Sequence, residues 1–123
     1  MVGEALDVCR ALAERVGGGD TRIQTVARTL ATSARSLQRH LAAAGVSYQR
    51  LLDMARQDAA ERYLPSSPLS IGEVAYLLGY SEPAAFNRAF RRWHKETPQA
   101  FRQRRRSDRL RMTVSAAFEI AGR

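Results

Sequence analysis

The chain has 123 residues, enough for one domain or two small subdomains with a modest core. Its net charge of +8, from 20 Lys and Arg against 12 Asp and Glu, favours a polyanionic partner. A single cysteine excludes an internal disulfide, and neither a membrane-spanning stretch nor a signal peptide is visible, so we expect a cytoplasmic protein without a membrane partner.

Three helices are predicted before residue 47. Residues 4–16 have a helical apolar pattern that ends at three glycines, and the side chains expected on its buried face are Leu6, Val8, Cys9, Leu12, Ala13 and Val16. We interpret Cys9 as buried filler rather than a reactive thiol. Residues 22–31 and 34–44 follow as two short helices with a tight turn between them. This pair indicates a helix-turn-helix, whose second helix can enter the major groove of DNA.

A longer helix is predicted over residues 48–64, with Ser47 as its N-cap and Pro65 as its stop. It contains no glycine or proline, so it is expected to act as a rigid spacer about 25 Å long. Ser70 and Glu73 have the spacing of a capping box, which predicts a helix over residues 71–78.

The last two helices are predicted from the residues at their N-termini. A helix is expected to follow Ser81 as its N-cap, with Pro83 in its first turn, and to reach residue 94. Thr97 and Pro98 begin the last predicted helix. Residues 107–123 show alternating and helical apolar spacings in turn, and we predict a basic, weakly ordered tail.

Residues 23–41 and 71–90 repeat one another. In the first half of the repeat, Ile23, Val26, Ala27, Leu30 and Ser33 match Ile71, Val74, Ala75, Leu78 and Ser81. One residue is then inserted, after which Leu37, Gln38, Arg39 and Leu41 match Phe86, Asn87, Arg88 and Phe90. The prediction is an all-α fold of about seven helices, with helix-turn-helix subdomains at 1–47 and 65–106, a connecting helix at 48–64 and a tail at 107–123.

The second helix of each copy has a polar outer face. With Leu37 and Leu41, or Phe86 and Phe90, turned to the core, side chains suited to base recognition point outward. Arginine can form two hydrogen bonds with guanine, Gln or Asn two with adenine, and a small apolar group can touch a thymine methyl. The predicted base contacts are Arg35, Gln38, Arg39, Ala84, Asn87 and Arg88. The alternative interpretation is that these residues form an ordinary solvated polar face without a binding role.

Other residues suit the phosphate backbone, which contributes affinity without sequence information. Hydroxyl groups near helix starts can donate to phosphate oxygens, and cations beside the second outer face can neutralise them. The predicted phosphate contacts are Thr32, Ser33, Ser81, Arg91, Arg92, Lys95 and Arg102.

No signature of catalysis, metal binding or a cofactor stands out. His40 and His94 have no partners at metal-ligand spacing, and the motifs of phosphate loops and nucleophile elbows are missing, so we predict a non-enzyme without a cofactor. Trp93 lies on an apolar stripe and Tyr80 after a turn glycine, so both are interpreted as packing residues rather than base-stacking ones.

Residues 21–104 resemble the DNA-binding domain of the AraC/XylS family of bacterial transcription regulators. The resemblance rests on VARTLATSARSLQRHL, on YQRLLDMARQDAAERYL and above all on LSIGEVAYLLGYSEPAAFNRAFRRWHKETPQAFR. It implies two helix-turn-helix subdomains that place recognition helices in successive major grooves of an asymmetric double-stranded promoter site, and RNA polymerase as a partner.

The sequence departs from the family pattern at three points. Ala31 stands where glycine is common in the first turn, and Pro83 and Ala84 stand where some relatives carry polar base readers. The effector-binding and dimerisation domain of most members is also missing, so we favour a fragment over a stand-alone regulator. The rival hypotheses are a non-specific basic architectural or RNA-binding protein, which has no sequence preference, and a module that binds a protein through residues 83–94.

Overall fold

The computed structural model describes residues 2–122, with side chains from Ala5 onward, and this part of the chain contains seven helices and no strand. In chain order they are α1 Val2–Arg15, α2 Ile23–Thr29, α3 Ala34–Ala43, α4 Tyr48–Ser66, α5 Ile71–Leu77, α6 Pro83–His94 and α7 Pro98–Ala121. The all-α prediction is confirmed. No helix among the described residues is long and apolar enough to cross a bilayer.

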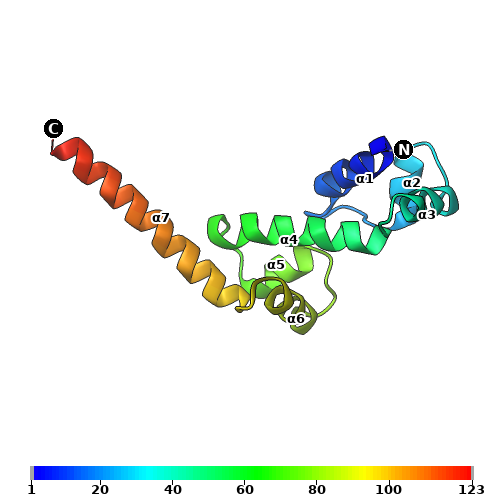
Figure 1. The fold of residues 1–123 in the computed structure, drawn as a ribbon. Helices are drawn as coiled ribbons and strands as arrows, with labels where there is room; N and C mark the ends of the chain where they lie inside the picture. Colours follow the sequence, from blue (N-terminus) through cyan, green and yellow to red (C-terminus); the bar gives the residue numbers. More distant parts are fainter. Residues whose placement is uncertain (1, 123) are drawn as a thin grey trace.

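The connecting helix α4 forms the centre of the fold (Figure 1). Helices α1, α2 and α3 gather around its first half, α5 and α6 lie beneath its second half, and α7 leaves from its far end (Figure 1). At 19 residues α4 is about 28 Å long, because an α-helix rises ~1.5 Å per residue. The two helix-turn-helix units are therefore held apart by one continuous helix.

Two apolar clusters form the core. The first joins α1, α2, α3 and the start of α4, with Val8, Leu12, Val26, Leu37 and Leu41 all buried. The second joins the end of α4 to the last three helices and contains Ala59, Leu64, Val74, Phe86, Phe90 and Phe101. The clusters touch: Ala55 packs against both, and Val16, which follows α1, belongs to the second.

Several predicted caps are confirmed. Ser47 and Thr97 accept hydrogen bonds from the backbone N–H groups of Arg50 and Ala100, both at 3.1 Å. Ser70 and Glu73 form the complete capping box of α5, with both bonds at 3.1 Å. These bonds satisfy N–H groups that the first helical turn leaves without a partner.

Some helix details differ from the prediction. Leu6 and Ala13 of α1 are exposed, because each lies at the margin of its apolar stripe. The connecting helix passes Pro65 and ends at Ser66. Proline removes one helical N–H, but the last turn is still closed by the Ser67 N–H, which donates to the Tyr63 carbonyl at 2.9 Å.

The prediction of a weakly ordered tail is wrong for residues 107–121, which continue α7. The segment contains no glycine or proline before Gly122, so nothing in its backbone interrupts the helix that Pro98 begins. Residue 123 lies outside the described residues.

Candidate nucleic-acid interface

Helix α3 presents the first predicted reading face. Ser33 caps it by accepting a hydrogen bond from the Ser36 N–H at 3.1 Å, and Leu37 and Leu41 are buried against α1 and α4. At 100° per residue, the opposite side of the helix then faces solvent. The exposed side chains there are Arg35, Gln38, Arg39 and Ala42.

Helix α6 presents the second reading face in the same way. Phe86, Ala89 and Phe90 are buried, and the ring of Phe86 packs against Phe90 with centroids 5.9 Å apart. The side chains that this arrangement turns to solvent are Ala84, Asn87, Arg88 and Arg91. The structure thus exposes all six predicted base-contacting residues, and the matched pairs Gln38/Asn87 and Arg39/Arg88 occupy equivalent places on the two helices.

The start of α6 differs from the prediction. Its N-cap is Glu82 rather than Ser81, and Glu82 makes no side-chain capping bond. Pro83 at the first helical position explains the shift, since proline keeps the residue before it extended, and Glu82 has φ −136° and ψ 132°. The inserted residue of the second repeat is accommodated here, and Ser81 lies exposed in the turn.

The two turns have the same hydrogen-bond pattern. In the first, the N–H groups of Ala31 and Thr32 donate to the carbonyls of Arg28 and Ala27 at 3.0 and 2.9 Å. In the second, Gly79 and Tyr80 donate to Tyr76 and Ala75, both at 3.0 Å. Both are Schellman motifs, which require a left-handed residue after the helix. The two copies of the sequence repeat therefore have the same backbone structure at their turns.

Ala31 takes up the left-handed conformation that its equivalent glycine adopts. Its φ is +58°, and that of Gly79 is +95°. An alanine in this region costs about 1–2 kcal/mol because its Cβ approaches the next carbonyl. The departure from the family pattern at Ala31 thus leaves the turn geometry unchanged and places backbone strain directly before α3.

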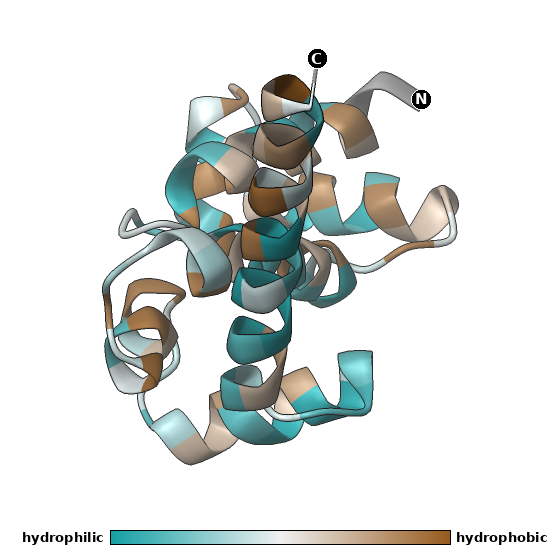
Figure 2. Cartoon of the chain, turned by 90° about the vertical axis from the view of Figure 1, so that its left-hand side faces the viewer, coloured by the Kyte–Doolittle hydropathy of each residue, from teal (hydrophilic) through white to brown (hydrophobic). Residues whose placement is uncertain are grey.

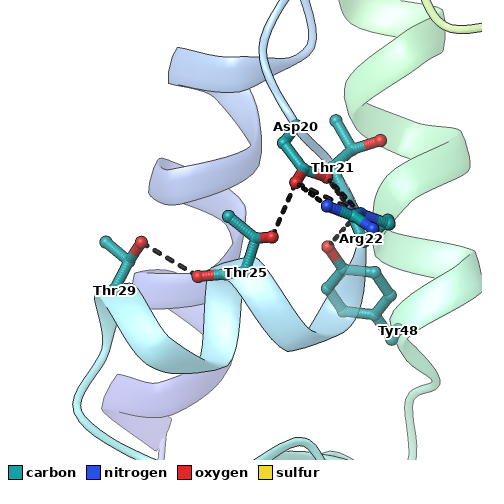
Figure 3. Close-up of polar contacts among 6 residues, drawn as sticks. All are labelled: Asp20, Thr21, Arg22, Thr25, Thr29 and Tyr48. Carbon is teal, nitrogen blue, oxygen red and sulfur yellow. Dashed lines mark hydrogen bonds and ion pairs between the residues drawn. The ribbon is translucent and has the colours of Figure 1, made fainter.

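A network around Asp20 fixes the start of α2 (Figure 3). The carboxylate accepts hydrogen bonds from the Arg22 side chain at 2.8 Å, from the Arg22 N–H at 2.9 Å and from the Thr25 hydroxyl at 2.7 Å. These bonds hold the pKa of Asp20 well below its usual range. The Tyr48 hydroxyl donates to the Thr21 carbonyl at 2.5 Å, which ties this turn to α4.

Arg56 anchors the second helix-turn-helix unit to α4, a role that was not predicted from the sequence. Its Nε donates to the Leu78 carbonyl at 2.9 Å, and its guanidinium lies 4.8 Å from the centroid of the Tyr80 ring. Tyr80 also packs against Phe86, with centroids 5.4 Å apart, which confirms it as a packing residue. The signal in the sequence was an arginine on the apolar side of α4, between Leu52 and Ala59.

The predicted phosphate contacts are accessible with one exception. Ser33, Ser81, Arg91, Arg92 and Lys95 are exposed, and Thr32 is half-buried at the first turn.

Arg102 is the exception, because it is only 7% exposed and its Nε donates to the Leu64 carbonyl at 2.6 Å. Burial lowers its pKa. Its prediction as a phosphate contact is wrong, since the side chain closes the end of α4 instead.

Other arginines of α7 are also used within the chain. Arg106 donates to the carbonyls of Pro65 and Ser67 at 3.3 and 2.9 Å, so it helps to cap α4. Arg104 pairs with Glu96 at 2.7 Å. Cations near a helix C-terminus are favoured by the exposed carbonyls there. Part of the positive charge that was predicted from the sequence to bind a polyanion therefore stabilises the fold instead.

The remaining candidates for other chemistry have structural roles. Trp93 is half-buried against the second core, with its ring edge-on to Phe90, and Cys9 is partly buried against the first. His94 lies 2.8 Å from Glu61 and stacks on Phe90. The part of the chain that the structure describes has no group of three His, Cys, Asp or Glu residues that could hold a metal ion.

Comparison with known proteins identifies the family. The helix-turn-helix domain family matches residues 26–104, the span that contains both reading faces and α4. The chain belongs to this AraC-type helix-turn-helix family.

Relatives and solved structures agree with this assignment. The ornithine utilization regulator of Pseudomonas aeruginosa is 42% identical over 81 residues, which cover 66% of this chain and 24% of that protein. A DNA-binding transcriptional dual regulator from Escherichia coli K-12 has a similar structure, with a TM-score of 0.74, 25% identity and coverage of 82% and 90% of the two chains. The chain spans about a quarter of the length of that curated relative.

A solved complex bears directly on the interface. The DNA-binding domain of AdpA, determined with a target DNA, has a TM-score of 0.65 and 30% identity, with 86% of this chain and 95% of that chain covered. The AraC-type domain described here is a sequence-specific DNA-binding domain of a bacterial transcription regulator.

Proposed function

We propose that the domain reads an asymmetric double-stranded promoter site with α3 and α6 in successive major grooves. The observation that carries the proposal is the pair of equivalent helices with exposed Gln38-Arg39 and Asn87-Arg88, attached to opposite halves of one helix. Successive major grooves on one side of B-DNA lie ~34 Å apart. A spacer about 28 Å long, with a recognition helix near each end, suits that separation.

The proposed division of labour follows from side-chain chemistry. Arg39 and Arg88 would each bind a guanine, and Gln38 and Asn87 an adenine, because these side chains match the hydrogen-bonding edges of those bases. Arg35 and Ala84 extend the two faces. Phosphate contacts are assigned to Thr32, Ser33, Ser81, Arg91, Arg92 and Lys95, which flank the reading faces. The two faces differ in sequence, so the site is asymmetric.

The wider biological role is proposed from the family. Binding near a promoter would position RNA polymerase in the cytoplasm, and no catalytic step is assigned to the chain. The effector-binding and dimerisation domain that the resemblance implied stays a prediction, since the chain spans 24% of the ornithine utilization regulator.

Selection from random duplex DNA, followed by sequencing of the bound pool, tests the proposal. The expected result is one enriched asymmetric motif with two boxes about one helical turn apart. A single box would mean that only one helix reads bases. No enrichment, together with binding that collapses in moderate salt, would favour the charge-only alternative, because phosphate contacts alone are sequence-independent and salt-sensitive.

A further inference from the structure

The second half of α7 carries apolar side chains that no other described part of the chain covers. Leu110, Val114 and Phe118 are 64%, 56% and 80% exposed. The helix projects away from the body (Figure 1), and its turns nearest the C-terminus carry the hydrophobic colouring while those nearer the body are hydrophilic (Figure 2). Large apolar groups in such a row mark an interaction surface.

This segment also lacks the packing that normally stabilises a helix. Isolated helices of about 15 residues are marginal in water, and most helical stability in proteins comes from burial of an apolar face. Thr113 and Val114 are β-branched, which lowers helix propensity further. Burial of this apolar face by a partner would therefore stabilise the helix over residues 107–121 further.

The outer stripe has the spacing of a helix-pairing seam. Leu110, Val114 and Phe118 follow one another at intervals of four residues, which forms a ridge along one face, and Arg111, Ser115 and Glu119 lie beside them. The opposite side, which includes Met112 and Ile120, faces an open hollow beside Pro65 at the end of α4. The outer stripe is the more continuous of the two sides.

The charge of the segment distinguishes it from the rest of the chain. Residues 107–122 contain Arg109 and Arg111 against Asp108 and Glu119, a net charge of zero, whereas the whole chain carries +8. Neutral segments from two copies do not repel one another. A neutral, apolar helix also has no net attraction for DNA or an anionic membrane.

We propose that the outer stripe of α7 pairs with the same stripe of a second copy, antiparallel and centred on Val114. Residues equally far from the centre then lie level, so Leu110 packs against the partner's Phe118, and the contact occurs twice by symmetry. Both copies contribute the same patch, so the interface closes on itself as a dimer.

Charge complementarity supports this orientation. On a helical wheel centred on Val114, Arg111 and Glu119 fall on the same flank, and an antiparallel twofold pair brings equal flanks together. Arg111 then lies about 3 Å along the axis from the partner's Glu119, within reach of its long side chain, and the contact again occurs twice. Arg111 already points along this flank, where it contacts Asp108 at 2.9 Å. A parallel twofold pair would instead join opposite flanks, so Arg111 would face the apolar flank that carries Leu110 and Ala117 rather than Glu119.

The pairing leaves the DNA-binding surface free. Helices α3 and α6 lie on the body, whereas the seam lies on the projecting end of α7 (Figure 1). Two bound domains joined in this way present four reading helices, which suits promoters with two adjacent sites.

Sedimentation velocity over a roughly hundredfold range of protein concentration tests the proposal, because a dimer becomes populated by mass action. The intact chain is expected to pass from monomer to dimer. Phe118→Glu should abolish the dimer, whereas Met112→Glu, a matched change at a 73% exposed residue on the opposite side, should leave it intact. Both sites are exposed, so neither change disturbs the core.

Charge reversal tests the orientation. Arg111→Glu and Glu119→Arg should each weaken the dimer, and the double variant should restore it. A chain that stays monomeric at all concentrations overturns the proposal. A dimer lost with Met112→Glu but not with Phe118→Glu would move the interface to the inner side, and failure of the double reversal would reject the antiparallel arrangement.

Discussion

Arg39 and Arg88 occupy equivalent places on α3 and α6, exposed beside Gln38 and Asn87. Replacing either arginine with alanine should cost about 1–3 kcal/mol of binding free energy on the cognate site and relax base preference at one position. Arg92→Ala, by contrast, should weaken binding about equally on all sequences, because a phosphate contact reads no base. Fluorescence anisotropy with cognate and scrambled duplexes measures both effects. Equal losses on the two duplexes for Arg39→Ala would contradict its role as a base reader.

Asp20 gives the fold a pH dependence at a single residue. Its hydrogen bonds with Arg22 and Thr25 lower its pKa from an ordinary value of 3.8, so its stabilising contribution is full above about pH 4 and is lost as pH falls through the lowered pKa. Asp20→Asn should remove that part of the acid decline in stability. Urea denaturation at a series of pH values compares the two proteins. If the free energies of unfolding of the two proteins change in parallel from neutral to acidic pH, the Asp20 network makes no contribution to the pH dependence of stability.

At the scale of the elements, the two turns provide opposite tests of one backbone conformation. Ala31→Gly should stabilise the domain by about 0.5–1 kcal/mol, since the relief of left-handed strain exceeds the added entropy of the unfolded chain. Gly79→Ala should destabilise it by about 1–2 kcal/mol or more. There φ is +95°, and a Cβ would lie 3.0 Å from Nη2 of Arg56. Urea midpoints of the two variants, measured against the parent, should move in opposite directions.

The same elements show what the sequence could predict. The apolar periods located the helices, and local caps such as the Ser70-Glu73 box located their starts, because both depend on residues within a few positions of one another. The exposed reading faces followed from the same periods. Features that depend on tertiary structure were missed.

Arg102 illustrates the limit most clearly. The position of Arg102 in the sequence, directly after Phe101, did not indicate a contact with Leu64. In the structure its Nε lies 2.6 Å from the Leu64 carbonyl oxygen, 38 residues earlier in the chain. The start of α6 was misplaced because Pro83 overrode the capping preference of Ser81. The tail was misread because its apolar residues match no buried face of the body and so gave conflicting periods.

At the scale of the molecule, the length of α4 sets the distance between the reading helices. Inserting about five base pairs between the two boxes of the selected site turns the second box to the opposite face of the duplex. Affinity should then fall close to that of a single box. About ten inserted pairs return the second box to the original face but move it one helical turn further away, so affinity should recover only if α4 is flexible. Electrophoretic mobility shifts on the spaced sites distinguish the outcomes. Unchanged affinity at five pairs would argue against a rigid α4.

Ala55 packs against both apolar clusters, and Val16 reaches from the first unit into the second core. This continuity makes the two halves one thermodynamic unit, so calorimetry should record a single unfolding transition whose van't Hoff and calorimetric enthalpies agree. Two resolved transitions would contradict it. A destabilising change in either half then lowers the folded population of both, and a bacterium that carries it loses recognition of the two boxes together rather than one at a time.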